Sequence, residues 1–324
     1  PAEDGIRDVL GGLVGSEMCI RDRPIQALID ALVQIGVQAR SIHDNGCPPV
    51  EVNGKNLSGT TVTVSCRESS QYLTGLLLMA PCTEGGLKIG VTEGPVSRPY
   101  VDMTIDVMSQ FGIAVHRQGY DGFHVAGRQA YRSGIYKVEA DASQAGYFWA
   151  AAAICHAAVK VKGVSQNSCQ GDVNFSKVLE SMGCMINNEP DGITVVGGDR
   201  LRAVEIDMGD MPDVVPTLAV VAAFAEGTTV IKNVSHLKSK ESDRLTSVVN
   251  ELIKMGVNAR CTDDELMVVG GQPQGAVIET YGDHRIAMSF ALAGLAVPGT
   301  HIRGEHCVEK SFPNYWRVLE GMYA

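Results

Sequence analysis

The sequence predicts an α/β protein built from repeated modules of about 70 residues that contain βαβ units. Two observations predict this class. Four helix-like segments each end at a glycine, which is followed by a short strand, a polar turn and a second strand. These glycines, Gly36, Gly112, Gly183 and Gly256, follow one another at intervals of 76, 71 and 73 residues. Such intervals are too long for the common solenoid repeats, so we expect layered domains, with helices either inside or outside the sheets.

The elements of each unit follow in chain order. The helix-and-strand units read LIDALVQIGVQA…VEVNG, DVMSQFGIAV…FHVAG, VLESMGCMI…ITVVG and VVNELIKMGVNA…LMVVG. A glycine directly after the last helical residue fits a left-handed C-cap. Small residues introduce five further strands, namely GTTVTV (59–64), GGLKIGV (85–91), AVKVKGV (158–164), GTTVIKNV (227–234) and GTHIRG (299–304).

Composition bounds the class of protein. With 324 residues the chain has room for two domains, and 45% hydrophobic and 20% charged residues are typical of a globular protein with a real core. The net charge of −10 disfavours a nucleic acid or an anionic membrane as partner. No apolar run reaches the ~20 residues of a membrane span. The nine cysteines are odd in number and never spaced C-x-x-C, which indicates reduced thiols in a cytoplasmic protein.

Residues 1–22 do not resemble the rest. GIRD (5–8) is partly echoed by CIRD (19–22), neither stretch carries a helix or strand pattern, and back-translation of EMCIRD matches a transposon end used in sequencing libraries. We expect 1–22 to be a non-native segment and the natural chain to begin near Arg23.

A polar cluster precedes a small-residue, apolar helix in each unit. These segments are SSQYLTGLLLMA at Ser70, DASQAGYFWAAAA at Ser143, MPDVVPTLAVVAAF at Asp213 and GDHRIAMSFALAGLA at Asp283. Helices that are apolar all round are buried, and their N-termini offer unpaired N–H groups, so several of them converging would form an anion site. The alternative is that the four residues are only N-caps. His284-Arg285 and Ser69-Ser70-Gln71 exceed what capping requires.

A further charged cluster begins the helix in HLKSKESDRLTSVVNELIKMG. Lys240 and Arg244 are four residues apart and are expected to share one helix face, with Glu241 beside them. Cations at a helix N-terminus oppose its dipole, so an anionic ligand explains them better than stability does; the alternative is a solvated charged face. The apolar stripe of this amphipathic helix is Leu245, Val248, Val249 and Leu252.

Together these motifs resemble the 5-enolpyruvylshikimate-3-phosphate (EPSP) synthase family. The motifs RPIQALIDAL, SSQYLTGLL, VSRPYVDMT, DASQAGYF, NSCQGD, MPDVVPT, KESDRL, GDHRIAM and EKSFPNYW occur in the family's order from Arg23 onward. The resemblance implies transfer of the enolpyruvyl group of phosphoenolpyruvate to the 5-hydroxyl of shikimate 3-phosphate, with release of phosphate. It also implies a two-domain, inside-out α/β barrel fold of βαβαββ modules. Residues 23–139 would form a partial N-terminal domain of about two modules, and residues 140–324 a C-terminal domain of three.

The resemblance also assigns roles, residue by residue. Asp213 is expected to be the base or orienter, Glu241 the proton donor to the methylene carbon, and Lys310 a catalytic cation. His236 stands where many relatives have Asn. The residues expected to hold shikimate 3-phosphate are Ser69, Ser70, Gln71, Ser97, Tyr100, Asp213, His236 and Lys240, and those expected around phosphoenolpyruvate are Arg23, Arg244, Arg285 and Lys310. No cofactor, metal, nucleic acid or membrane is implied, and the protein is expected to be a monomer.

The sequence departs from the family at its beginning. The family's N-terminal residues, which include an N-A-G-T-A-M-R type loop, do not appear, so we expect this chain by itself to be inactive. One alternative function is UDP-N-acetylglucosamine enolpyruvyl transferase, against which the SSQ, KESDR and DHR combination argues. The other is a non-catalytic ligand-binding module of the same fold. Retention of Asp213, Glu241 and Lys310 argues against it, because binding alone needs no acid–base pair.

Overall fold

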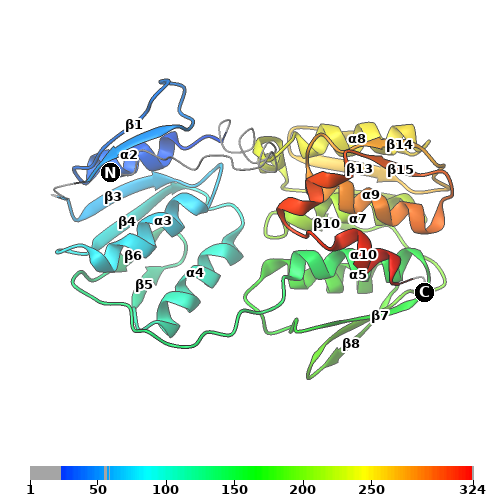
Figure 1. Cartoon of the computed structure of the whole chain (residues 1–324), viewed down its shortest axis with the longest axis horizontal. Coiled ribbons are helices and arrows are strands. Elements are labelled where there is room, and N and C mark those ends of the chain that lie inside the picture. The colour runs from blue at the N-terminus through cyan, green and yellow to red at the C-terminus, as the bar shows by residue number, and fades with distance from the viewer. Residues whose placement is uncertain (1–22, 55–56, 58, 323–324) are drawn as a thin grey trace.

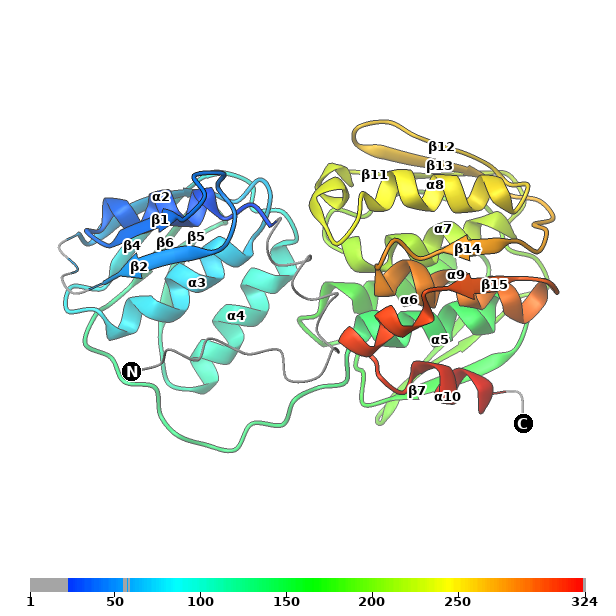
Figure 2. The ribbon, with the colours of Figure 1, turned by 45° about the horizontal axis from the view of Figure 1, so that its top comes forward.

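A computed structural model describes residues 23–54, 57 and 59–322, and residues 1–22 lie outside this part. Figures 1 and 2 show two halves that lie side by side. In the first half β1 pairs with β2 antiparallel, and a second sheet has the order β3-β4-β6-β5, in which β3 and β4 are parallel. Its elements are α2 (Gln26–Gln34), β1 (Gln38–Ser41), β2 (Val50–Asn53), β3 (Thr61–Ser65), α3 (Gln71–Met79), η1 (Ala80–Cys82), β4 (Leu87–Glu93), α4 (Arg98–Gln110), β5 (Val115–Gln118) and β6 (Gly122–Val125).

The second half carries sheets of order β7-β9-β8, β10-β11-β13-β12 and β14-β15. Its helices are α5 (Ala142–Ile154), α6 (Phe175–Ser181), α7 (Val215–Ala223), α8 (Arg244–Lys254), α9 (His284–Ala296) and α10 (Tyr315–Glu320). Its short 3-10 helices are η2 (Gly171–Asn174), η3 (Pro212–Val214), η4 (Ser235–Ser239) and η5 (Glu305–Lys310). Its strands are β7 (Ala158–Lys162), β8 (Met185–Glu189), β9 (Gly192–Val196), β10 (Glu205–Asp207), β11 (Thr228–Lys232), β12 (Asn258–Cys261), β13 (Glu265–Val269), β14 (Val277–Glu279) and β15 (His301–Arg303).

Helices lie inside and sheets outside in the second half. The three apolar helices α5, α7 and α9 contact one another, and every residue of α7 is buried. Their Ala-rich sequences carry no amphipathic stripe, so a position with neighbours on all sides is the one that buries all of their apolar surface. The starts of the three helices share one end of this half, because Arg285 at the start of α9 bonds to Asp213 just ahead of α7 and lies 3.5 Å from the Tyr147 hydroxyl in α5.

The pivot glycines adopt the left-handed conformation that the sequence predicts. Gly36, Gly112, Gly183 and Gly256 have φ values of 89°, 84°, 108° and 76°. In this region a side chain is strained, so glycine ends each helix and turns the chain into the next strand.

Two separate hydrophobic cores form, one from buried residues between Ala31 and Val125 and the other from buried residues between Ala142 and Leu319. The expected domain boundary at residue 139 falls between Val125 and Ala142 and stays a prediction.

The two halves meet where α4 begins. The Arg98 backbone N–H donates to Asp210 Oδ1 at 3.0 Å across the junction. A Cβ on Gly171 would lie 2.3 Å from the carbonyl oxygen of Asp210 and 2.7 Å from Pro99 Cγ. Only glycine therefore permits this close approach of the second half to the start of α4.

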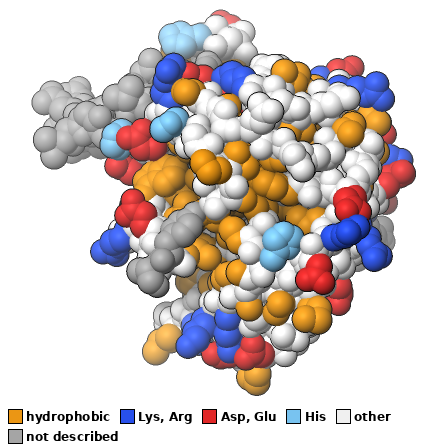
Figure 3. All heavy atoms as spheres, turned by 90° about the vertical axis from the view of Figure 1, so that its right-hand side faces the viewer, with side chains coloured by type: hydrophobic (Ala, Val, Ile, Leu, Met, Phe, Trp, Pro, Cys, Tyr) orange, Lys and Arg blue, Asp and Glu red, His pale blue; other side chains and the backbone are white. Residues whose placement is uncertain are grey.

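The outer face of the second half, at the right of Figure 1, carries hydrophobic side chains in its middle, with acidic and basic side chains interspersed around them (Figure 3). Within the residues that the structure describes, none of the helices combines the length and the apolarity that crossing a bilayer requires.

Candidate active site

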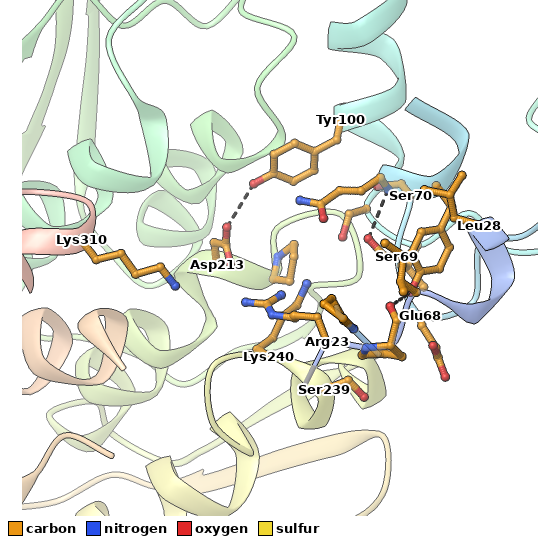
Figure 4. A pocket seen from close by; sticks show the side chains of 18 residues that line it. Arg23, Leu28, Glu68, Ser69, Ser70, Tyr100, Asp213, Ser239, Lys240 and Lys310 are labelled. Carbon is orange, nitrogen blue, oxygen red and sulfur yellow. Dashed lines mark hydrogen bonds between the residues drawn. The ribbon is translucent and has the colours of Figure 1, made fainter. Parts of the chain in front are cut away.

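A cavity of about 580 Å³ lies between the two halves. In Figure 4 the side chains of Lys310 and Lys240 extend from the second half toward the space between Asp213 and Ser69. The first half contributes the start of α3 and the start of α4. Of the residues predicted from the sequence, those that line the cavity are Arg23, Ser69, Ser70, Gln71, Ser97, Tyr100, Asp213, Lys240 and Lys310.

The start of α3 presents hydroxyl and amide groups to the cavity. The Gln71 N–H donates to Ser69 Oγ at 3.2 Å, whereas the side chain of Ser70 makes no capping hydrogen bond and is buried. Ser97, also buried, precedes α4 with a left-handed φ of 54°. Serine hydroxyls at two helix N-termini are suited to an anion such as a phosphate group.

Asp213 joins the groups at the centre of the site. Arg285 Nη2 donates to its Oδ2 at 2.7 Å, Arg244 Nη1 donates to its Oδ1 at 2.9 Å, and the Tyr100 hydroxyl donates to Oδ2 at 3.1 Å. Burial by itself would raise the pKa of Asp213, but the charges of Arg285, Arg244 and Lys240 outweigh burial and hold that pKa well below its ordinary value. Asp213 is therefore ionised throughout the physiological pH range.

Arg244 is a buried cation held by three carboxylates. Its side chain is 2% exposed. Besides its bond to Asp213, it donates from Nε to Asp283 Oδ2 at 2.8 Å and from Nη2 to Glu241 Oε2 at 2.7 Å. Its planar guanidinium makes four hydrogen bonds to the three carboxylates, one more than the three N–H donors of a lysine could make.

The expected common helix face of Lys240 and Arg244 is wrong. Helix α8 begins at Arg244, and Lys240 lies before it in extended backbone with φ −93° and ψ −154°. The physical reason is the N-cap. The Asp243 side chain accepts from the Thr246 N–H at 3.1 Å, so the helix begins directly after Asp243 and does not include Lys240. The predicted apolar stripe is confirmed, because Leu245, Val248, Val249 and Leu252 are buried.

Glu241 accepts hydrogen bonds from several cations. Lys310 Nζ donates to its Oε1 at 2.8 Å, and Arg23 Nη2 lies 2.9 Å from the same oxygen. Burial acts to raise the pKa of Glu241, but Arg244, Lys310 and Arg23 overcome burial and hold it well below the ordinary range. With these cations beside it, Glu241 is a carboxylate.

Only one of the four cap candidates is a side-chain cap. Asp283 accepts from the Arg285 N–H at 2.9 Å, and it also holds Arg244. Ser143 lies inside α5, which is capped by Asp141, and Asp213 lies in η3 ahead of α7. The capping interpretation therefore does not account for Ser143 or Asp213, and for Asp283 it accounts for only part of the bonding.

The remaining predicted residues lie at and behind the cavity wall. Lys240, which lines the cavity, forms no ion pair or hydrogen bond with any residue in the described part of the chain, and burial lowers its pKa. His236 and His284 are buried, and burial lowers the pKa of each to about 4, so both rings are neutral near pH 7. His236 does not line the cavity, and its contact with a substrate stays a prediction.

The sequence assigned no role to Asp172 or Tyr147. Arg285 Nη1 lies 3.5 Å from the Tyr147 hydroxyl, and Asp172 is a buried carboxyl close to this network. The available signals were a Tyr within an Ala-rich helix and the last residue of NSCQGD. Among residues 23–54, 57 and 59–322, no cluster of His, Cys, Asp or Glu side chains has the arrangement of a metal site.

Comparison with known proteins shows which family this chain resembles. Residues 9–319 match the family described as EPSP synthase (3-phosphoshikimate 1-carboxyvinyltransferase). The chain is 41% identical to the 3-phosphoshikimate 1-carboxyvinyltransferase of Methanoculleus marisnigri over 309 residues, which cover 95% of this chain and 73% of that protein. It is 42% identical to the enzyme of that name from Syntrophobacter fumaroxidans, covering 93% of this chain and 72% of that one.

Solved structures resemble it as well. The structure of EPSP synthase from Acinetobacter baumannii superposes with a TM-score of 0.77 at 26% identity, covering 95% of this chain and 77% of that one. The enolpyruvyl transferase NikO from Streptomyces tendae superposes with a TM-score of 0.75 at 22% identity, covering 92% and 71% of the two chains, and shares the fold. These matches confirm the resemblance and the fold class that the motifs predicted.

Proposed function

Because the chain belongs to the EPSP synthase family, we propose that its cavity binds shikimate 3-phosphate and phosphoenolpyruvate and transfers the carboxyvinyl group from the second to the first. The observation that carries this proposal is the gathering of cations at one cavity. Arg244 and Arg285 bond to the ionised Asp213, and the further cations that line the cavity with it are Arg23, Lys240 and Lys310. Two polyanionic substrates require this excess of positive charge, and a carboxylate at its centre can accept from a substrate hydroxyl.

The two substrates would occupy opposite sides of the cavity. Ser69, Ser70 and Ser97 would hold the phosphate of shikimate 3-phosphate, and Asp213 its hydroxyl groups. Tyr100, Gln71 and Lys240 would complete that side. The cations on the phosphoenolpyruvate side would be Lys310, Arg23, Arg244 and Arg285, and the guanidinium groups of the three arginines suit bidentate carboxylate and phosphate recognition.

The reaction needs one group that accepts a proton and another that donates one. The 5-hydroxyl oxygen forms a bond to C2 of phosphoenolpyruvate while a proton reaches the methylene carbon C3. Phosphate then leaves C2 as C3 gives a proton back, which restores the double bond. Asp213, held ionised, would orient the hydroxyl and accept from it. Because its pKa is so low, orientation is the larger part of this role.

Glu241 would be the proton donor, and to donate it must first gain a proton. Lys310 and Arg23 bond to Glu241 and keep it ionised. An anionic phosphoenolpyruvate would attract both cations, and the pKa of Glu241 would rise as they turn toward the ligand. Substrate binding would thereby prepare the acid.

Replacing Lys310 by Met is expected to weaken phosphoenolpyruvate binding about 10- to 100-fold, because a charge-assisted hydrogen bond contributes about 1.5–3 kcal/mol. Calorimetric titration with phosphoenolpyruvate in the presence of shikimate 3-phosphate measures the change. The matched control is Lys238→Met, because Lys238 is a nearby lysine that pairs with Asp263 outside the cavity lining. Equal losses in both variants would show that Lys310 acts only through the general charge of the region.

Shikimate 3-phosphate is expected to raise the melting temperature of the protein, and UDP-N-acetylglucosamine is not. A ligand at one hundred times its Kd stabilises the folded state by about 2.7 kcal/mol. Differential scanning fluorimetry over a range of ligand concentrations measures the shift. Stabilisation by the uridine sugar nucleotide alone would favour the second enolpyruvyl transferase activity, and stabilisation by neither ligand would contradict the proposed site.

A further inference from the structure

A buried carboxyl group near Asp213 has no part in the mechanism above. Asp172 lies in η2 and is 4% exposed. The Ser143 hydroxyl, from the first turn of α5, donates to Asp172 Oδ2. The other oxygen, Oδ1, is buried and has no hydrogen-bond partner among the residues that the structure describes. A buried polar atom without a partner is uncommon and requires a physical explanation.

The surroundings of Asp172 differ from those of the other carboxylates in this region. Asp213, Glu241 and Asp283 each form an ion pair with Arg244, whereas Asp172 forms none with any Arg or Lys in the described residues. The groups that act on Asp172 come from several elements: Asp213 in η3, Arg285 in α9, Asp141 and Ser143 at the start of α5, and Tyr100 in α4. Burial, and then the negative charge of Asp213, raise the pKa of Asp172 to about 7.

We propose that Asp172 is a positioning residue that works in its protonated form behind the anion site, where it leaves the charge of Arg285 directed at Asp213 and at the bound substrate. This inference rests on the proposed function for the identity of the substrate. A neutral carboxyl can stay buried beside Ser143 without a counter-ion. An ionised Asp172 would be a second carboxylate acting on Arg285, and it would compete with the substrate anion for that charge.

The protonation of Asp172 can be tested without a substrate. An acid whose pKa is higher in the folded than in the unfolded chain loses stability as pH rises from the unfolded value to the folded one, here from about 4 to about 7. Asp172→Asn removes this loss. The melting temperature of the variant minus that of the wild type is therefore expected to be larger at pH 8 than at pH 5. An equal difference at both pH values would overturn the proposal.

Glu251→Gln is the matched control, because Glu251 is a fully buried carboxylate that is paired, with Lys254 at 2.8 Å. This variant is expected to melt below the wild type at pH 8, without the gain from pH 5 to pH 8 that is expected of Asp172→Asn. If Asp172→Asn does not fold, Ser143→Ala serves as the second variant. It removes a donor that lowers the pKa of Asp172, so the loss of stability is expected to extend to higher pH. An unchanged pH dependence in Ser143→Ala would overturn the proposal as well.

The positioning role is tested by binding. Phosphoenolpyruvate is titrated into the wild type and Asp172→Asn, each saturated with shikimate 3-phosphate, at pH 6 and at pH 8. Ionisation of the ligands is the same for both proteins and cancels in the ratio of their affinities. The ratio is expected to be near one at pH 6 and to favour the variant by about tenfold at pH 8.

The two measurements separate the possible failures. The expected melting behaviour without phosphoenolpyruvate binding in either protein would contradict the proposed function and leave the protonated state of Asp172 supported. Binding with the same affinity in both proteins at pH 8 would overturn the positioning role and leave the proposed function intact.

Discussion

Replacing Asp213 by Asn is expected to lower turnover by at least about 100-fold, because the variant loses both the carboxylate that orients the hydroxyl and the acceptor for its proton. The amide keeps the shape of the side chain but carries no charge, so it can neither accept the hydroxyl proton nor hold Arg244 and Arg285 as a carboxylate does. Because these contacts matter most in the transition state, kcat should fall far more than the affinity for shikimate 3-phosphate. Steady-state phosphate release by the wild type and the variant measures kcat, and calorimetry measures binding.

Asp210→Asn is the control for this experiment. Asp210 is an aspartate in the same loop, and it accepts from the Arg98 N–H of the first half but does not line the cavity. Its variant is expected to keep nearly normal turnover. Turnover near that of the wild type in Asp213→Asn would remove Asp213 from the chemical step.

Replacing Arg244 by Met is expected to lower the free energy of unfolding by about 3–5 kcal/mol, because it leaves buried carboxylates without their shared cation. The loss of Arg244 would destabilise Asp283 most, because the Asp283 side chain is fully buried and is paired with the Arg244 guanidinium. Urea denaturation, followed by circular dichroism, measures the loss. The exposed ion pair of Arg40 with Glu51 provides the control, and Arg40→Met is expected to change stability little.

The loss in Arg244→Met should depend on pH in a defined direction. Burial alone would raise the pKa of Asp283, but Arg244 lowers it below its ordinary value. A lowered pKa contributes stability that is present above the unfolded value, near 4, and is lost as pH falls through the folded value. The difference between wild type and variant is therefore expected to be largest at neutral pH and to shrink on acidification below about pH 4. A constant difference would mean that packing, and not charge, causes the loss.

Local patterns predicted most of the fold. The glycine at the end of each helix-like segment depends only on neighbouring residues, so Gly36 and Gly183 could be placed without tertiary information. The burial of α5, α7 and α9 follows from sequences that are apolar on all sides. Whether helices or sheets lie inside depends on how modules pack together, which periodicity does not encode.

The motifs supplied the list of expected site residues, whose roles in binding and catalysis stay predictions, but not the bonding among them. Nine of the expected residues line the cavity, whereas Glu241, Arg244 and Arg285 do not. The motifs also did not show that Arg244 bonds to carboxylates from three different segments of the chain. The prediction that Lys240 lies on the helix was wrong, because α8 begins only at Arg244, directly after its N-cap residue Asp243. Asp172 was not predicted because its distinguishing feature is that Oδ1 has no hydrogen-bond partner in the described residues, and the lack of a partner becomes visible only in the three-dimensional structure.

The separation of the two hydrophobic cores bears on how this protein loses its structure. Residues that belong to different cores need not unfold together, so the chain is expected to contain more than one cooperative unit. Arg244 and its carboxylates belong to the second unit, and a denaturation curve for Arg244→Met reports on that unit. The cavity takes its walls from both, and a ligand that binds only when both walls are folded links their unfolding equilibria. Occupancy of the site would thus convert two independently melting bodies into one.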